Sequence, residues 1–145
     1  MFLHTYRWPR TGGAPSFIGS KVVRVPLRDD YSHDVEGMIK ADPDAGAYYI
    51  CNPNNPTGTL TTRKGVEYLL ANKKKNAVVV IDEAYIHFSD DAQSAADLVA
   101  ADKDVIVLRT FSKIYGWPAC APVSPSHGPT CWAKCDRSRP ADFCR

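Results

Sequence analysis

The chain has 145 residues, of which 44% are hydrophobic and 23% charged, and its formal net charge is +2 at pH 7. This length and composition suit one globular domain with a substantial core. The nearly balanced charge gives no electrostatic reason to expect a nucleic-acid or membrane partner. The longest apolar run, Ala77–Ile81, is too short to cross a membrane, and the N-terminus has no signal pattern, so we expect a cytoplasmic protein.

The five cysteines form no recognisable metal or disulfide pattern. Cys51 stands alone at the end of an expected strand, and we interpret it as a small core residue. No Cys-x-x-Cys pair occurs among the other four, so we expect neither a zinc site nor a disulfide. These four cysteines are Cys120, Cys131, Cys135 and Cys144.

The first part of the chain changes character near residue 20. Residues 1–19 lack sustained periodicity and contain several prolines and glycines, so we expect an irregular lead-in. Lys21–Val25 is rich in β-branched residues and predicts a strand. His33–Lys40 has apolar residues at helical spacing and predicts a helix, with Ser32 or Asp34 as its N-cap.

Strands and helices then alternate along the chain. This order predicts an α/β fold with a mainly parallel sheet flanked by helices. In such sheets ligands bind beyond the carboxyl ends of the strands. The expected elements are strand Ala47–Cys51, a helix capped by Thr61 or Thr62, strand Ala77–Ile81, helix Ser94–Ala101 and strand Val105–Leu108.

Polar clusters follow three of these strands, namely Asn52–Gly58, Asp82–Tyr85 and Thr110–Lys113. Each has an ordinary structural interpretation: the first as a tight turn, the second as a helix cap, and the third as a loop with an exposed lysine. Together they offer more, because they can meet at one sheet edge. A Schiff-base lysine, an acid for a ring nitrogen, donors to a phenolic oxygen and hydroxyls for a phosphate are what an electron-sink cofactor requires.

The three clusters, read as Asn-Pro-Asn-Asn-Pro-Thr-Gly, Asp-Glu-Ala-Tyr and Thr-Phe-Ser-Lys, resemble the large domain of the class I/II, fold-type-I pyridoxal-phosphate aminotransferases. Within that superfamily the chain is most similar to histidinol-phosphate aminotransferases. The resemblance covers residues 20–116 and implies a partial cofactor-binding large domain. It also implies a homodimer that moves an amino group between an amino acid such as glutamate and a 2-oxo acid or phosphorylated ketone in amino-acid biosynthesis, as in histidine biosynthesis.

The resemblance assigns a role to each site residue. It implies that Lys113 forms the Schiff base with the aldehyde of pyridoxal 5′-phosphate and moves the substrate proton. Asp82 would pair with the pyridinium nitrogen and keep it protonated. The remaining contacts it implies are Asn55 and Tyr85 on the phenolate oxygen and Thr110 and Ser112 on the phosphate, with a cis Asn55–Pro56 bond.

The chain departs from the family pattern at both ends. Residues 1–19 supply neither the expected phosphate loop nor the aromatic residue that stacks on the cofactor. After Gly116 the family continues Met-Ala-Gly-Leu-Arg, whereas this chain reads Trp117–Ala121, and the family's small domain is missing. We expect residues 117–145, rich in proline and cysteine, to be a disordered tail.

A reading-frame change explains the tail. Codons that can encode Trp117 and its neighbours regroup, after one lost base at Gly116 is restored, into Met-Ala-Gly-Leu-Arg-Ala-Gly, the family continuation. We therefore hypothesise that residues 117–145 are translated out of frame, and resequencing the gene through the Gly116 codon tests this. Two alternatives stay open: an enzyme like threonine-phosphate decarboxylase, which shares the motifs, and a non-catalytic truncated remnant.

Overall fold

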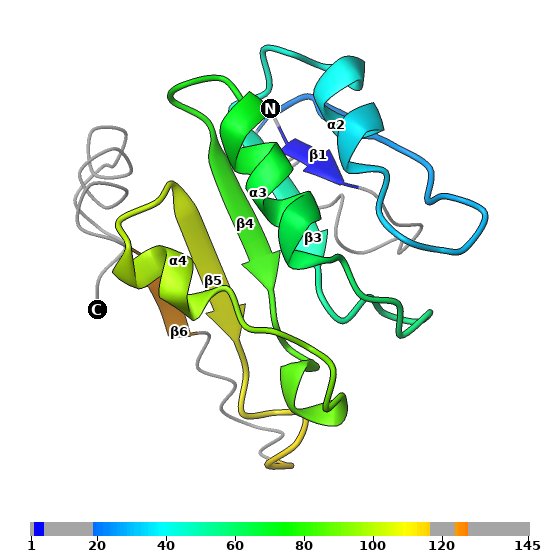
Figure 1. Cartoon of the computed structure of the whole chain (residues 1–145), viewed down its shortest axis with the longest axis vertical. Coiled ribbons are helices and arrows are strands. Elements are labelled where there is room, and N and C mark those ends of the chain that lie inside the picture. Colours follow the sequence, from blue (N-terminus) through cyan, green and yellow to red (C-terminus); the bar gives the residue numbers. More distant parts are fainter. Residues whose placement is uncertain (1, 5–18, 117–123, 128–145) are drawn as a thin grey trace.

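The computed structural model describes residues 2–4, 19–116 and 124–127 and shows a sheet with helices packed on it (Figure 1). The strand order is β2-β1-β3-β4-β5-β6, in which β6 is antiparallel to β5 and the other neighbours are parallel. The α/β class with a mainly parallel sheet is therefore confirmed. The strands are β1 Phe2–His4, β2 Val22–Arg24, β3 Ala47–Cys51, β4 Val78–Asp82, β5 Val105–Arg109 and β6 Ser124–His127.

The helices connect successive parallel strands. Figure 1 shows α3 passing in front of β3 and β4, with α4 beside it over β5. The side chain of Asp34 accepts the backbone N–H of Gly37 at the start of α2, and that of Thr62 accepts the backbone N–H of Gly65 at the start of α3. Each helix therefore uses one of the two N-cap residues expected for it. The helices are α2 Val35–Ala41, α3 Arg63–Asn72, α4 Ala96–Ala100 and the short 3₁₀ helix η1 Ile86–Phe88.

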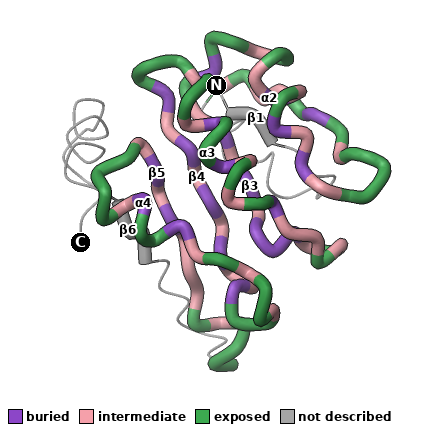
Figure 2. The backbone as a smooth tube through the Cα atoms, in the orientation of Figure 1, coloured by how far each residue is buried: buried purple, intermediate pink, exposed green. Residues whose placement is uncertain are grey.

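The core lies between the sheet and the helices. Alternate residues of the central strands are buried, and their neighbours are half-buried, as the colours along β4 show (Figure 2). This alternation follows from the pleat of a strand, which sends successive side chains to opposite faces. The fully buried strand residues pack in one cluster with Met38 of α2 and Leu69 of α3; they are Tyr48, Ile50, Val79, Ile81, Val105 and Val107.

Two short strands lie where we expected no regular structure. Phe2–His4 forms β1 between β2 and β3, so the irregular lead-in is wrong for these three residues. Ser124–His127 forms β6 along β5, so the disorder expected of the tail is wrong there. Both strands form because their backbones pair with the free backbone groups of neighbouring strands. Segments this short are too brief to show a periodic pattern of apolar residues. Residues 5–18, 117–123 and 128–145 lie outside the described part of the chain.

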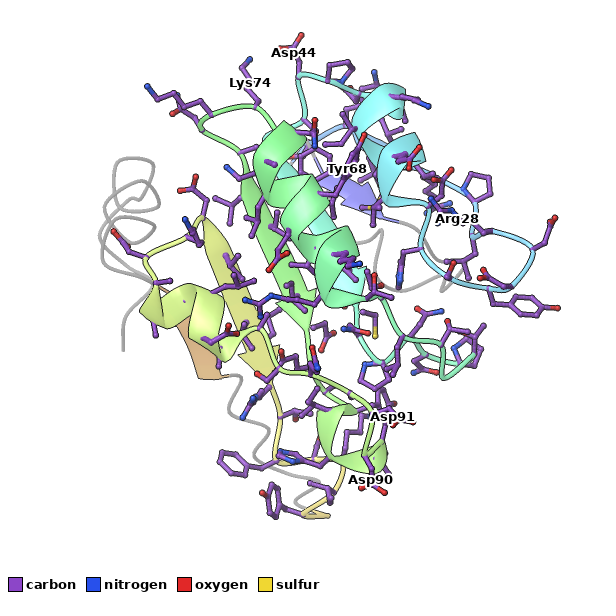
Figure 3. The ribbon with its side chains drawn as sticks, in the orientation of Figure 1. Arg28, Asp44, Tyr68, Lys74, Asp90 and Asp91 are labelled. Atoms are coloured by element: carbon purple, nitrogen blue, oxygen red, sulfur yellow. The ribbon has the colours of Figure 1, made fainter. Side chains whose placement is uncertain are left out.

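The two ends of the sheet have different polar residues. Lys74 and Asp44 form an ion pair of 2.8 Å at the amino ends of β3 and β4, far from Asp90 and Asp91, which follow η1 near the carboxyl ends (Figure 3). This exposed pair links two connecting loops and lies away from the predicted site. Within the described residues, no helix has the length and apolar character needed to cross a membrane.

Candidate functional site

The register of the sheet brings the three polar clusters to one edge. Cys51 pairs with Asp82, and Asp82 pairs with Leu108, so β3, β4 and β5 end at the same level. The backbone N–H of Asn52 donates to the Asp82 carbonyl at 2.9 Å, and that of Glu83 donates to the Leu108 carbonyl at 2.8 Å. The clusters thus start side by side, as the sequence predicted.

Three predicted residues come together above this edge. The Asn55 amide Nδ2 donates to the Tyr85 hydroxyl at 3.1 Å, and the Lys113 Nζ lies 5.5 Å from the centroid of the Tyr85 ring. Asn55 and Tyr85 are half-buried, whereas Lys113 is exposed. A cation over an aromatic face is held weakly, so the amine keeps its freedom to reach a ligand. One amide, one phenol and one amine therefore share a small space.

Asp82 ends β4 with its carboxylate held by two neutral donors. Its Oδ1 accepts the backbone N–H of Ala84 at 3.0 Å, and its Oδ2 accepts the Tyr49 hydroxyl at 2.5 Å. None of the ion pairs formed among the described residues includes Asp82. A half-buried carboxylate in this state has spare lone pairs and an uncompensated charge, which is what a cationic ligand requires.

Thr110 and Ser112 form a hydroxyl pair next to Lys113. Their Oγ atoms lie 2.8 Å apart, and the Ser112 backbone N–H donates to Thr110 Oγ1 at 3.1 Å. Both residues are half-buried just beyond the end of β5. Two hydroxyl groups held side by side in this way can each donate a hydrogen bond to an anionic oxygen.

The loop that carries Asn55 is fixed by its own polar contacts. The Asn52 side chain accepts the Thr61 backbone N–H at 2.9 Å and donates to the Thr61 carbonyl at 3.3 Å. The Asn55–Pro56 bond is cis as expected, and Asn52–Pro53 is cis as well. Gly58 has a φ of +71°, a conformation that favours glycine. The loop borders a hollow of about 290 Å³ whose lining includes Pro53, Asn55, Tyr85 and Phe88.

Two contacts of the site were missed by sequence reasoning. One is the Tyr49 hydroxyl on Asp82; the tyrosine is two positions before the end of an expected strand, where nothing in the sequence gives the direction of its hydroxyl. The other is an ion pair between Glu83 and Arg109. Glu83 directly follows Asp82 and Arg109 directly precedes Thr110, so a charged residue at each strand end was the available signal.

The half-buried Cys51 thiol lies on β3 beside the site, where its surroundings disfavour the reactive thiolate. Burial raises the pKa of this thiol to about 11, and the negative charge of Asp82 adds to the effect. Near pH 8 its thiolate fraction is then about 100-fold lower than for a thiol with the ordinary value of 9.0.

We therefore expect iodoacetamide to alkylate Cys51 about 100-fold more slowly in the native chain than in the chain unfolded by urea. Mass spectrometry of the Cys51 peptide against time measures both rates, and the unfolded chain serves as the control. Equal rates in the two states would contradict a raised pKa of the Cys51 thiol in the folded chain.

The comparison with known proteins agrees with this geometry. The family described as aminotransferase class I and II matches residues 2–123. The chain belongs to this family. It is 38% identical over 104 residues to a histidinol-phosphate aminotransferase of Halalkalibacterium halodurans, covering 70% of this chain and 28% of that protein. It is 39% identical over 99 residues to an aromatic amino acid aminotransferase of Rhodococcus jostii, with 68% and 28% covered.

Solved structures show the same relationship. The histidinol-phosphate aminotransferase of Sinorhizobium meliloti, in complex with pyridoxal-5′-phosphate, matches with a TM-score of 0.81 and 27% identity, covering 96% of this chain and 38% of that one. The alanine aminotransferase of Pyrococcus furiosus matches with a TM-score of 0.77 and 25% identity, covering 94% and 37%. The chain spans less than a third of the length of the curated relatives it matches, so it carries a part of the family's structure.

Proposed function

We propose that this chain is the cofactor-binding part of a pyridoxal-phosphate-dependent aminotransferase. The observation that carries the proposal is the Asp82 carboxylate, which is oriented by Tyr49 and Ala84 at a strand end and has no ion-pair partner among the described residues. A protonated ring nitrogen of the cofactor would supply the missing positive charge. Membership of the family supports the same cofactor.

The other described residues fit the remaining groups of pyridoxal phosphate. Asn55 Nδ2 and the Tyr85 hydroxyl, 3.1 Å apart, would both contact its phenolate oxygen. The Thr110 and Ser112 hydroxyls would contact its phosphate. The exposed Lys113 amine, beside the Tyr85 ring, would hold its aldehyde. Donors, acid and amine thus correspond to the four polar groups of one small molecule.

Bound pyridoxal phosphate would supply an electron sink for the electron pair left on the substrate Cα when its proton leaves. The chain's own residues do the rest. Asp82 holds a positive charge at the ring nitrogen, and Asn55 and Tyr85 stabilise negative charge at the phenolate oxygen. The Lys113 amine would accept the proton from the substrate Cα and return it later in the transfer.

Amino acids and oxo acids are the substrates that we propose for the whole enzyme. Glutamate as donor and a phosphorylated ketone of the histidinol-phosphate type as acceptor follow from the similarity to histidinol-phosphate aminotransferases. An aromatic amino acid is the second candidate, because aromatic amino acid aminotransferases match at similar identity. A cytoplasmic homodimer acting in histidine biosynthesis belongs to the same proposal.

Amino-group transfer tests the function. The chain is loaded with pyridoxal phosphate and incubated separately with glutamate, histidinol phosphate and phenylalanine. We expect at least one donor to yield pyridoxamine phosphate and the corresponding oxo product in equal amounts, because the amino group leaves the donor for the cofactor. Liquid chromatography quantifies both products, and the faster of histidinol phosphate and phenylalanine distinguishes the two candidate substrate classes.

The alternatives give different products. Carbon dioxide released from threonine phosphate, without pyridoxamine phosphate, would favour a decarboxylase; the solved threonine-phosphate decarboxylase from Porphyromonas gingivalis, at 20% identity, shares the fold. Cofactor bound without any transfer would identify a non-catalytic remnant. A chain that binds no cofactor would overturn the proposal as a whole.

A further inference from the structure

Tyr49 is the residue that connects β3 to the acid of the site. It lies in the middle of β3, and its register partner on β4 is Val80, two positions before Asp82. Tyr49 and Asp82 thus occupy the same face of the sheet on diagonal positions, which a long aromatic side chain can span. The Tyr49 hydroxyl accordingly donates to Asp82 Oδ2 at 2.5 Å.

The contact fixes one of the two oxygens of the carboxylate. The backbone N–H of Ala84 holds the other at 3.0 Å. Without the Tyr49 hydroxyl, the Ala84 amide alone would orient the group, and the carboxylate could turn about its terminal bond. Two donors, one from each of two neighbouring segments, therefore define the direction in which the remaining lone pairs of Asp82 point.

Tyr49 remains a donor under all ordinary conditions. Burial raises the pKa of its hydroxyl far above the usual range, and the negative charge of Asp82 raises it further. The hydroxyl thus keeps its proton, and Asp82 remains the acceptor in this pair. The hydrogen bond is charge-assisted, and such bonds are stronger than those between neutral groups.

We propose that Tyr49 is a positioning residue, which holds the Asp82 carboxylate in the direction of the cofactor's ring nitrogen. The proposal rests on the proposed function, and it adds a residue that acts through Asp82 without touching the cofactor. Removing the Tyr49 hydroxyl would therefore weaken the contact between Asp82 and the ring nitrogen and leave the phosphate and phenolate contacts unchanged. A cofactor analogue with carbon at the ring-nitrogen position therefore separates positioning from a general loss of structure.

The test compares Tyr49→Phe with Tyr48→Phe. Tyr48 is the next residue on β3, but it points into the core on the opposite face, and its hydroxyl donates to the Asp42 carbonyl at 3.4 Å. Equilibrium dialysis measures the dissociation constants of pyridoxal phosphate and of its 1-deaza analogue for the wild-type chain and both variants. Each substitution removes one hydroxyl from a tyrosine of β3, so the pair is matched.

We expect Tyr49→Phe to weaken binding of pyridoxal phosphate about tenfold, the usual effect of losing a hydrogen bond to a charged group. Binding of the deaza analogue should change less than about twofold, because it has no ring nitrogen for Asp82 to meet. Tyr48→Phe should leave the ratio of the two constants as in the wild type. In an Asp82→Asn background, adding Tyr49→Phe should no longer change the ratio.

The outcomes separate the two proposals. If the wild-type chain binds pyridoxal phosphate and Tyr49→Phe leaves the ratio unchanged, the positioning role is wrong and the proposed function stands. If Tyr49→Phe weakens both ligands equally, Tyr49 supports the fold alone, and the positioning role is again wrong. If the wild-type chain binds pyridoxal phosphate no more tightly than the deaza analogue, and Asp82→Asn leaves both dissociation constants unchanged, the proposed function fails. The role of Tyr49 then fails with it.

Discussion

We expect replacement of Lys113 by alanine to abolish the borohydride-stable adduct that the proposed function predicts between this chain and pyridoxal phosphate. Borohydride reduces the bond between an amine and the cofactor aldehyde, so the cofactor remains attached to whichever lysine held it. Lys113 is the lysine that lies beside Tyr85 at the meeting point of the three clusters. Mass spectrometry of the reduced, digested chain locates the adduct and measures its stoichiometry.

Two further variants define the role of the amine. Lys113→Arg keeps the positive charge but cannot form the bond, so we expect it to lose the adduct as Lys113→Ala does. Lys75→Ala, which removes another exposed lysine, should keep the full adduct. For amino-group transfer we expect a loss of at least about 100-fold in Lys113→Ala, because the proton carrier is gone. An adduct of unchanged stoichiometry in Lys113→Ala would contradict the assignment.

We expect Glu83→Ala to destabilise the fold by about 3 kcal/mol, the lower part of the range for removing one partner of a buried ion pair, because only the Glu83 side of this pair is fully buried. Glu83 is 1% exposed and accepts from the Ala95 backbone N–H at 2.7 Å and the Ser94 hydroxyl at 2.9 Å. It also accepts from Arg109 Nε at 3.0 Å. Alanine leaves these donors without their acceptor. The Arg109 side chain is 40% exposed, so water compensates for part of the loss.

Urea unfolding followed by circular dichroism measures the free energy of unfolding of each variant. Glu83→Gln retains the shape and one acceptor oxygen, so we expect a smaller loss than for alanine. Glu67→Ala is the matched control, since Glu67 pairs with Arg63 at the surface with 55% of its side chain exposed. A pair of this kind contributes about 1 kcal/mol or less. Similar losses in Glu83→Ala and Glu67→Ala would refute a structural role for the Glu83–Arg109 pair.

The Glu83–Arg109 ion pair also connects the segments that carry the site residues. Glu83 follows Asp82 at the end of β4, and Arg109 precedes Thr110 at the end of β5. Their ion pair, 2.9 Å long, therefore ties the segment with the acid to the segment with the hydroxyls and the lysine. The contacts of Glu83 with Ser94 and Ala95 add the start of α4 to the same connection.

The sequence by itself determined the class of the fold and predicted which residues form the candidate site. Strand Ala47–Cys51 has the predicted bounds, and Thr62 caps α3 as one of the two expected residues. These features are local, since the spacing of apolar residues and the presence of a hydroxyl before a helix act within a few residues. The three motifs followed strand ends, and the parallel order alone placed them at one edge.

Only the tertiary structure decided the partners of the site residues and the short outer strands. The Tyr49 hydroxyl reaches Asp82 because the register pairs Tyr49 with Val80, two positions before Asp82 on the same face of the sheet. Glu83 meets Arg109 because β5 ends at the same level as β4. Phe2–His4 is a strand because two neighbours offer backbone partners on both sides. Such contacts join residues far apart in the chain, and their free energy depends on geometry that no local pattern of residues encodes.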